Sequence, residues 1–325
     1  MTRTRMQQTM LATLALAVAA AGPAAAQDYP LKPIRVIVPF APGGGTDMMA
    51  RLTAQKLSEA WNQPVLVENR AGGTGAVGSV MVAKAPPDGY SLLFVTSSTH
   101  AISPALQSDL PYHPERDYAA VSLVATGPQV MVVHPSVPAR TVKELVALTK
   151  ARPSTLNYAS SGAGSAGHMT AELFKSVTGT RIEHVPYKGA GSVITDLVGG
   201  YVQMMFSGPG SVIPLINQGR LRPLAVAYSR RTAGLDNVPT FAEAGFPAVD
   251  ATQWYGVLTT AGTPRPVIDK LNRELVRILQ LPDVKEKLFA SGYYAEASTP
   301  QEFGQLISRE LAKWQKVAKA SGVKL

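Results

Sequence analysis

Residues 38–51, VPFAPGGGTDMMAR, constrain the fold most, because they read as a strand that ends in a glycine loop and continues into an amphipathic helix. Such a loop leaves backbone N–H groups free at the start of a helix, where the helix dipole favours negative charge. A second loop of this kind occupies residues 157–170, NYASSGAGSAGHMT, between a short strand and another helix. Two such loops, one in each half of the chain, predict a carboxylate held between two lobes.

The first residues carry the pattern of an export signal. Residues 1–26 contain Arg3 and Arg5 but no acidic residue, followed by the apolar run MLATLALAVAAAG and by AAA directly before Gln27. This order is typical of a secretory leader with a small-residue cleavage site. The apolar run is shorter than the roughly 20 residues that span a bilayer, so we favour a cleaved leader over an N-terminal anchor.

Composition excludes several classes of protein. The chain has no cysteine, which excludes disulfides and thiolate chemistry. Its net charge is +9, but the basic residues are scattered over separate predicted helices and do not alternate with aromatic residues as in nucleic-acid-binding proteins. The five histidines show no metal-ligand spacing, and no glycine loop continues into a nucleotide-binding signature. We therefore expect no nucleic-acid partner, no metal and no cofactor.

Strands and helices alternate along the whole chain, which predicts an α/β fold with largely parallel sheets. A chain of this length exceeds the size at which a single core usually stops growing, so two lobes are expected. Segments near residues 125–129 and 227–230 suit crossings between the lobes. The expected organisation is a leader at 1–26, lobe 1 at 27–126 and 229–325, and lobe 2 at 127–228.

A series of motifs follows in order along the chain: PFAPGGGTD, ENRAGGTGAVGS, PPDGYSLLF, YASSGAGSAGHM, VPYKGAG, NQGRLRPLAV, NVPTFAEAGFP, WYGVLTTAGTP and LAKWQKVAKASGVKL. In this combination the chain resembles the tripartite tricarboxylate transporter substrate-binding proteins, the Bug or TctC family. The resemblance implies a two-lobed periplasmic binding protein of the type II-like, Venus flytrap kind, with the ligand cleft between the lobes.

The resemblance also implies what such a protein does. It closes on a small organic carboxylate, a di- or tricarboxylate or an aromatic acid, and delivers it to the large and small permease subunits of a membrane transporter. It performs no chemistry. In this family the carboxylate is held largely by backbone groups and ordered waters between the two glycine loops. An alternative of the same fold presents its ligand to a membrane sensor kinase.

The same resemblance assigns the first loop to the ligand through Phe40, Ala41, Pro42, Gly43, Gly44, Thr46 and Asp47. Alternatively, the glycines only permit a tight strand-to-helix turn, and Asp47 only caps the helix. Four residues that follow the strand ending at residue 96 are further candidates, because ligands lie beyond the carboxyl ends of parallel strands. These are Ser97, Ser98, Thr99 and His100, and hydroxyl capping is their alternative role.

In the second loop, hydroxyl and amide donors to a carboxylate are expected from Ser160, Ser161, Gly162, Gly164 and Ser165. His168 begins the next helix and either contacts the ligand or packs or caps there. Tyr187 and Lys188 follow another strand, where Tyr187 is assigned to the cleft and Lys188 is equally suited to an exposed loop. Ser207 stands where many members of the family have an Asp, which disfavours amino-acid ligands and favours plain carboxylates or aromatic acids.

An enzyme is disfavoured by the residues themselves. Ser165 and His168 lie only three residues apart, with neither a G-x-S-x-G elbow nor a well-placed acid to form a triad. A secreted hydrolase therefore remains a remote alternative, and no catalytic residue is assigned.

Overall fold

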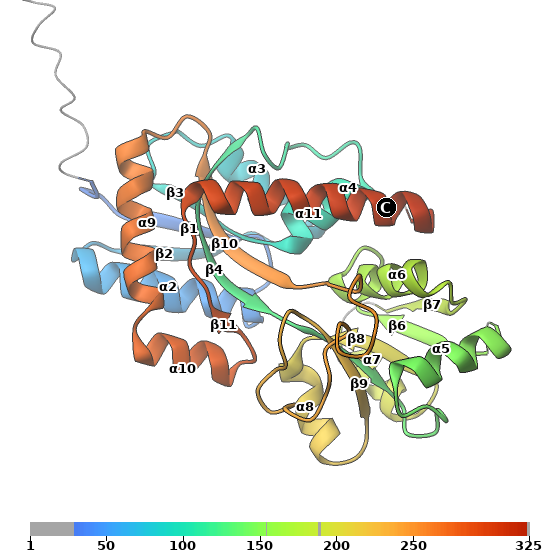
Figure 1. Ribbon diagram of the computed structural model, residues 1–325. Coiled ribbons are helices and arrows are strands. Elements are labelled where there is room, and N and C mark those ends of the chain that lie inside the picture. Colours follow the sequence, from blue (N-terminus) through green and yellow to red (C-terminus); the bar gives the residue numbers. More distant parts are fainter. Residues whose placement is uncertain (1–28, 154, 188–189, 324–325) are drawn as a thin grey trace, which may run out of the picture.

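The computed structural model describes residues 29–153, 155–187 and 190–323, so the predicted leader and Lys188 lie outside the described residues. Two β-sheets build two lobes, which Figure 1 shows next to one another. The first sheet has the strand order β11-β4-β10-β3-β1-β2 and the second has the order β7-β6-β8-β5-β9.

The first sheet forms lobe 1. Its strands are β1 (Ile34–Val38), β2 (Val65–Asn69), β3 (Ser91–Thr96), β4 (Tyr118–Gly127), β10 (Gln253–Thr260) and β11 (Tyr294–Ala295). Leu92 and Phe94 of β3 face one core, while Leu93 and Val95 face another, as alternation along a strand requires. The first core is closed by α2 (Gly45–Trp61), α9 (Arg265–Leu279) and α10 (Pro282–Ala290), and the second by α3 (Ala76–Ala83), α4 (Ser103–Leu106), the helical turn η2 (Ser98–Ile102) and α11 (Pro300–Ser321).

The second sheet forms lobe 2. Its strands are β5 (Gln129–Val133), β6 (Asn157–Ser160), β7 (Glu183–Pro186), β8 (Met204–Ser207) and β9 (Arg222–Ala227). Apolar side chains of α5 (Val142–Ala151) and α6 (Ala166–Thr178) cover one face, and those of α7 (Ala190–Val198) and α8 (Pro209–Asn217) cover the other. The α5/α6 core is continuous with the α3/α11 core of lobe 1, so the two lobes share buried apolar surface.

The expectation of largely parallel sheets was wrong, because both sheets are mixed. In lobe 1, β1 runs parallel to β2 and β3, whereas β10 runs antiparallel to β3 and β4. In lobe 2, β6 runs parallel to β7 and β8, whereas β5 runs antiparallel to β8 and β9. The antiparallel strands are those next to the crossings between lobes, and a local sequence pattern does not specify the direction in which such a strand enters a sheet.

The chain crosses between the lobes as expected at Gly127 and Pro128, which separate β4 from β5. The return crossing lies later than expected, because residues 229–250 pack mainly against lobe 2, although Arg230 and Ala233 also contact Tyr294 of β11 in lobe 1. Val226 of β9 forms a bridge with Thr240, and the Phe241 ring lies 6.0 Å from that of Phe206 in β8. The return to lobe 1 therefore occurs just before β10, which begins at Gln253.

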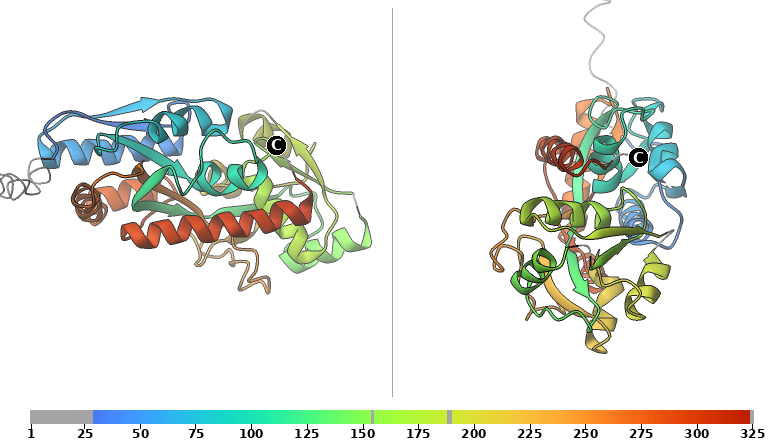
Figure 2. Two further views of the ribbon diagram at one scale, coloured as in Figure 1. Left: turned by 90° about the horizontal axis from the view of Figure 1, so that it is seen from above. Right: turned by 90° about the vertical axis from the view of Figure 1, so that its right-hand side faces the viewer.

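The C-terminal helix α11 connects the two lobes from outside the sheets. It begins with a capping box in which the Thr299 side chain and Glu302 satisfy each other's backbone N–H groups. Along its length it contacts β4, η2 and α4 in lobe 1 and α6 in lobe 2, and Figure 2 shows it extended beside both. No helix within the described part of the chain is both long and apolar enough to cross a bilayer.

Candidate functional site

A cavity of about 490 Å³ lies between the two lobes, within the range of about 300–1,000 Å³ of small-molecule sites. Lobe 1 contributes Phe40, Thr74, Ser98, Ser103 and Tyr293, and the crossing strands β5 and β10 contribute Gln129 and Gln253. Lobe 2 contributes residues 161–167, residues 205–208 and Ser211. Both predicted glycine loops therefore reach the same cavity, the first through Phe40 and the second through residues 161–167.

The first loop is held in place by Asp47 rather than presenting Asp47 to the cavity. One Asp47 carboxylate oxygen accepts hydrogen bonds from the Gly43 amide at 3.0 Å and from Arg51 Nε at 2.9 Å, and the other accepts one from Asn69 Nδ2 at 2.9 Å. Asn69 also donates to the carbonyl of Phe40 at 3.1 Å. These bonds fix the turn between the cavity-lining Phe40 and the start of α2.

Burial raises the pKa of Asp47, but the hydrogen bonds from Arg51, from the Gly43 amide and from Asn69 outweigh it and lower the pKa to about 2. Asp47 is therefore a carboxylate at neutral pH that already has its partners. Ala41, Pro42, Gly43, Gly44 and Thr46 do not line the cavity. Gly43 needs its positive φ of 89°, while Gly44 has an ordinary φ of −82° and is the uncapped N-cap of α2.

The second loop presents residues 161–167 at the N-terminus of α6. The Ser165 side chain caps this helix by accepting a hydrogen bond from the His168 amide at 3.3 Å. Gly162 and Gly164 have φ of 142° and 71°, which L-residues with side chains rarely adopt. At Gly167 a Cβ would lie only 2.5 Å from the carbonyl oxygen of Phe206, so only glycine lets α6 approach β8 this closely.

His168 lies behind the second loop, not in the cavity. It is 3% exposed, and its Nδ1 accepts a hydrogen bond from the Gly164 amide at 2.9 Å. Its ring stacks on that of His184 with centroids 3.9 Å apart. Ser160, at the end of β6, connects the same layer to the loop, because its hydroxyl donates to the carbonyl of Gly162 at 2.9 Å and lies 2.7 Å from His184 Nε2. The packing role considered for His168 is thus the one the structure shows.

Of the four candidates after β3, only Ser98 lines the cavity. The hydroxyl of Thr99 instead bonds to the backbone N–H and carbonyl of Thr96, so it joins η2 to the end of β3. His100 is 0% exposed and packs against the rings of Tyr112 and Tyr118, and burial lowers its pKa to about 3. His100 is therefore a neutral core residue, and it lies in the π-helical turn η2, which turns its side chain inward. Ser97 is 4% exposed and also lies outside the cavity lining.

Of the two remaining candidates, Ser207 lines the cavity and Tyr187 does not. The Tyr187 hydroxyl donates to Asp196 of α7 at 2.6 Å, so it braces the chain after β7 and does not line the cavity. Ser207 does line it, at the end of β8 and directly before α8. Gly208, which also lines the cavity, is the N-cap of α8 and has no side-chain cap, so a second helix N-terminus besides that of α6 lies at the cavity. The first residue of α8, Pro209, has no N–H, and the Ser211 amide donates to the Gly208 carbonyl at 3.2 Å.

Sequence reasoning missed several residues of the lining, above all Gln129 and Tyr293. Gln129 is 2% exposed, and its Oε1 has no hydrogen-bond partner among the described residues. The Tyr293 side chain lies against Gly45 and Gly127, where an added Cβ would lie 2.6 Å from its hydroxyl oxygen and 2.7 Å from its ring, respectively. The Gly127-Pro128 crossing was a signal for Gln129, while no local pattern marked Tyr293, Thr74, Ser103, Ser211 or Gln253.

Neutral donors dominate this cavity. None of the described residues that line it carries a charge, and the polar groups are hydroxyls, two glutamine amides and backbone N–H groups at helix starts. Within the described residues no group of three or more His, Cys, Asp or Glu could hold a metal ion. Such a surface suits an anion that is bound by hydrogen bonds and helix dipoles, as at other helix N-termini.

Comparison with known proteins agrees with this geometry. A family model described as "Tripartite tricarboxylate transporter family receptor" matches residues 49–323. Protein BugT of Bordetella pertussis is 38% identical over 320 residues, which cover 97% of this chain and 98% of that protein. An R. palustris protein solved with adipate has a TM-score of 0.80 and 36% identity, covering 91% of this chain and 99% of that one. MatC from Rhodopseudomonas palustris, solved with bound malate, has a TM-score of 0.76 and 30% identity, covering 89% and 99%.

Proposed function

This chain belongs to the tripartite tricarboxylate transporter receptor family, and we propose that it captures a small organic carboxylate in the cavity between its lobes and delivers it to the membrane subunits of a tripartite transporter. As a member it is a periplasmic solute-binding protein, and it binds its ligand rather than converting it. The ligand class, the membrane partner and the residues that contact the ligand are what we propose.

Helix N-termini of lobe 2 converge on a cavity that lobe 1 closes, and this convergence supports the proposed binding of a carboxylate. The starts of α6 and α8 lie there with Ser161, Ser165 and Ser211, and Ser98 and Ser103 lie on the opposite side. A carboxylate at this place accepts hydrogen bonds from backbone and hydroxyl donors and also gains from the helix dipoles. Solved relatives with adipate and malate support this class of ligand.

The proposed contacts are the predicted residues that line the cavity, namely Phe40, Ser98, Ser161, Gly162, Gly164, Ser165 and Ser207, together with Thr74, Ser103, Gln129, Ser211, Gln253 and Tyr293. No described lining residue is acidic, so an ammonium group has no charged partner in this set. We therefore keep plain carboxylates and aromatic acids, rather than amino acids, as the ligand class.

The proposed export and partner follow from the same role. Removal of residues 1–26 releases the protein into the periplasm, and the large and small permease subunits then receive the ligand from its closed form. A sensor kinase is the alternative receiver. Co-purification of the ligand-loaded protein with large and small permease subunits supports the transport role, and selective association with a sensor kinase contradicts it.

A thermal-shift screen of the mature protein tests the binding role. Adipate, malate, citrate and benzoate are compared with adipamide, which keeps the chain of adipate but lacks its charge. A ligand that binds only the folded state raises the melting temperature, and at a hundredfold excess over the dissociation constant it stabilises by about 2.7 kcal/mol. We expect one of the acids to raise the melting temperature and adipamide to leave it unchanged. Equal shifts for adipate and adipamide, or none with any acid, would contradict the proposal.

A further inference from the structure

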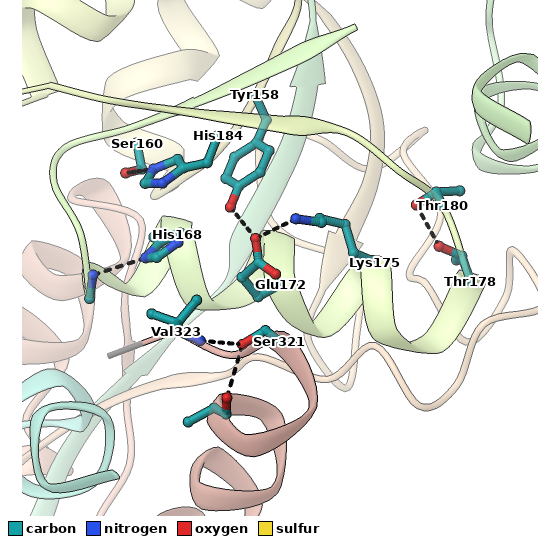
Figure 3. A network of polar contacts seen from close by, with 12 residues as sticks. Tyr158, Ser160, His168, Glu172, Lys175, Thr178, Thr180, His184, Ser321 and Val323 are labelled. Carbon is teal, nitrogen blue, oxygen red and sulfur yellow. Dashed lines mark hydrogen bonds and ion pairs between the residues drawn. The ribbon is translucent and has the colours of Figure 1, made fainter. Parts of the chain in front are cut away.

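Two histidines stack behind the glycine loop of lobe 2, as Figure 3 shows. The rings of His168 and His184 are 3.9 Å apart and 10° from parallel, and Tyr158 continues the stack at 4.8 Å from His184. His168 comes from α6 and His184 from β7, so the stack joins two elements that flank the loop. Both histidines reach the loop, His168 through Gly164 and His184 through Ser160.

The hydrogen bond to Gly164 fixes the protonation state of His168. The Gly164 amide donates to Nδ1 at 2.9 Å, so this nitrogen must carry a lone pair. A protonated imidazole has N–H groups at both nitrogens and would face the amide with a second donor. Gly164 lies in the left-handed region and lines the cavity, so loss of this bond removes the contact that holds its conformation.

His184 does not have the same constraint. The Ser160 hydroxyl has one proton, which donates to the Gly162 carbonyl. With the proton placed there, the Ser160 oxygen can accept from Nε2–H of His184, a group present in the protonated imidazole and in one of its neutral tautomers. The effect of His184 on His168 is electrostatic, since two cationic rings at this separation repel each other. His168 is therefore the member of the pair whose protonation disrupts the loop.

Among the charged and titratable groups around His168, some oppose its protonation and Glu172 favours it. Glu172, one turn further along α6, accepts hydrogen bonds from Tyr158 and from Lys175, so its charge is shared. Lys316 and Lys319 on α11, which packs against α6, are exposed. Burial lowers the pKa of His168 to about 4, with a further lowering by His184 and Lys175 and an opposing effect of Glu172. Burial also lowers the pKa of His184.

We propose that His168 is a positioning residue for the ligand-binding loop, and that its protonation releases Gly164 and thereby lowers the affinity of the cavity for its carboxylate. The proposal rests on the function proposed above. Binding in this arrangement is linked to protons, because the ligand favours the neutral imidazole. The protein therefore holds its ligand at neutral pH and releases it more readily in acid.

Two variants separate the hydrogen bond from the ring. His168→Asn places an amide oxygen near the position of Nδ1 and does not titrate, so it keeps an acceptor for Gly164 at every pH. His168→Phe keeps the stacked ring but removes the acceptor. His113→Asn, at an exposed histidine outside the cavity lining, is the control for loss of a histidine as such.

The first readout is the ligand-free protein in solution. We expect the Gly164 amide resonance of the wild type to move with the titration of the His168 imidazole, and that of His168→Asn to stay constant. The folded state also loses stability as the pH falls from 6.5 toward about 4, because the lowered pKa disfavours the protonated form. Circular dichroism at each pH therefore identifies the range in which the protein remains folded.

The second readout is the dissociation constant for adipate and for malate between pH 7.5 and pH 3.5. With a pKa of about 4 for His168, the wild type should lose about fourfold more affinity than His168→Asn at pH 3.5. The comparison with His168→Asn corrects for protonation of the ligand itself. His168→Phe should bind weakly at every pH, and His113→Asn should follow the wild type.

Three results would overturn the inference: a Gly164 amide that does not move while His168 titrates, a His168 that stays neutral until the protein unfolds, or identical pH profiles for wild type and His168→Asn. If neither acid binds at pH 7.5, the proposed function fails for these ligands, while the Gly164 amide still decides the inference. The two failures are thus distinguishable.

Discussion

At the residue scale, two side chains that hold the glycine loops in place, Asp47 and His168, do not line the cavity. Asp47 fixes the first loop from behind, and His168 fixes the second. The sequence placed both residues in the right loops, because a polar side chain near a glycine-rich helix start is a recognisable pattern. The sequence could not show whether each side chain contacts the ligand or supports the loop, because that depends on the direction in which α2 and α6 turn the side chain.

Two helical glycines with different surroundings, Gly167 and Gly304, give a prediction at the residue scale. Gly167 and Gly304 both lie in helices, but a Cβ at Gly167 would lie 2.5 Å from the Phe206 carbonyl oxygen, whereas one at Gly304 would meet only Ala120 Cβ at 3.9 Å. Gly167→Ala must push α6 away from β8, which costs about 1–3 kcal/mol of folding free energy. It should also weaken carboxylate binding about tenfold or more, as measured by calorimetry.

Gly304→Ala is the matched control, since alanine is favoured over glycine in a helix by about 1 kcal/mol. We expect unchanged affinity and equal or higher stability for this variant. Full affinity in a folded Gly167→Ala protein would show that the approach of α6 to β8 does not shape the binding site.

At the element scale, the sequence predicted the repeating strand–loop–helix units and failed where the chain departs from them. The strand–loop–helix unit expected at residues 38–51 is present, with β1 ending at Val38 and α2 occupying Gly45–Trp61. Helix α8 was missed because Pro209, Gly210 and Pro214 obscure its helical pattern. The two-residue strand β11 was missed as well, since its pairing with β4 depends on residues distant in sequence.

The turn between α10 and β11 carries Tyr293 into the cavity, and this placement gives a second prediction. Tyr293 packs edge-on against Tyr255 at 5.2 Å and fills the space left by Gly45 and Gly127 at the crossing. Tyr293→Ala should enlarge the cavity on its lobe 1 side and lower carboxylate affinity by about tenfold, in the range of a lost aromatic contact.

Tyr201→Ala is the comparison, because this tyrosine is 78% exposed and lies outside the cavity lining. Calorimetry should give it the affinity of the wild type. If both variants bind equally well, Tyr293 belongs to the packing of lobe 1 and has no part in the site.

At the scale of the whole molecule, the two-lobed binding-protein fold expected from the sequence is confirmed by solved relatives that cover most of the chain. The crossing at Gly127 lies within the segment expected near 125–129, whereas the return crossing was expected too early, near 227–230, because residues 229–250 lack strong periodicity. Lobe 1 and lobe 2 meet at the cavity, at the crossings and along α11. A ligand that contacts both lobes binds the closed arrangement better than an open one and so shifts the population toward closure.

The distance between the lobes, measured with and without ligand, tests whether the protein captures its ligand between them. The chain has no cysteine, so spin labels at Val77→Cys in lobe 1 and Tyr201→Cys in lobe 2, both exposed positions, need no background substitutions. The ligand-free distance distribution is recorded first, and then that with the acid that calorimetry shows to bind, beginning with adipate and malate. We predict a narrower distribution centred on a changed distance. An open, broad distribution that a saturating bound carboxylate leaves unaltered would contradict capture between the lobes.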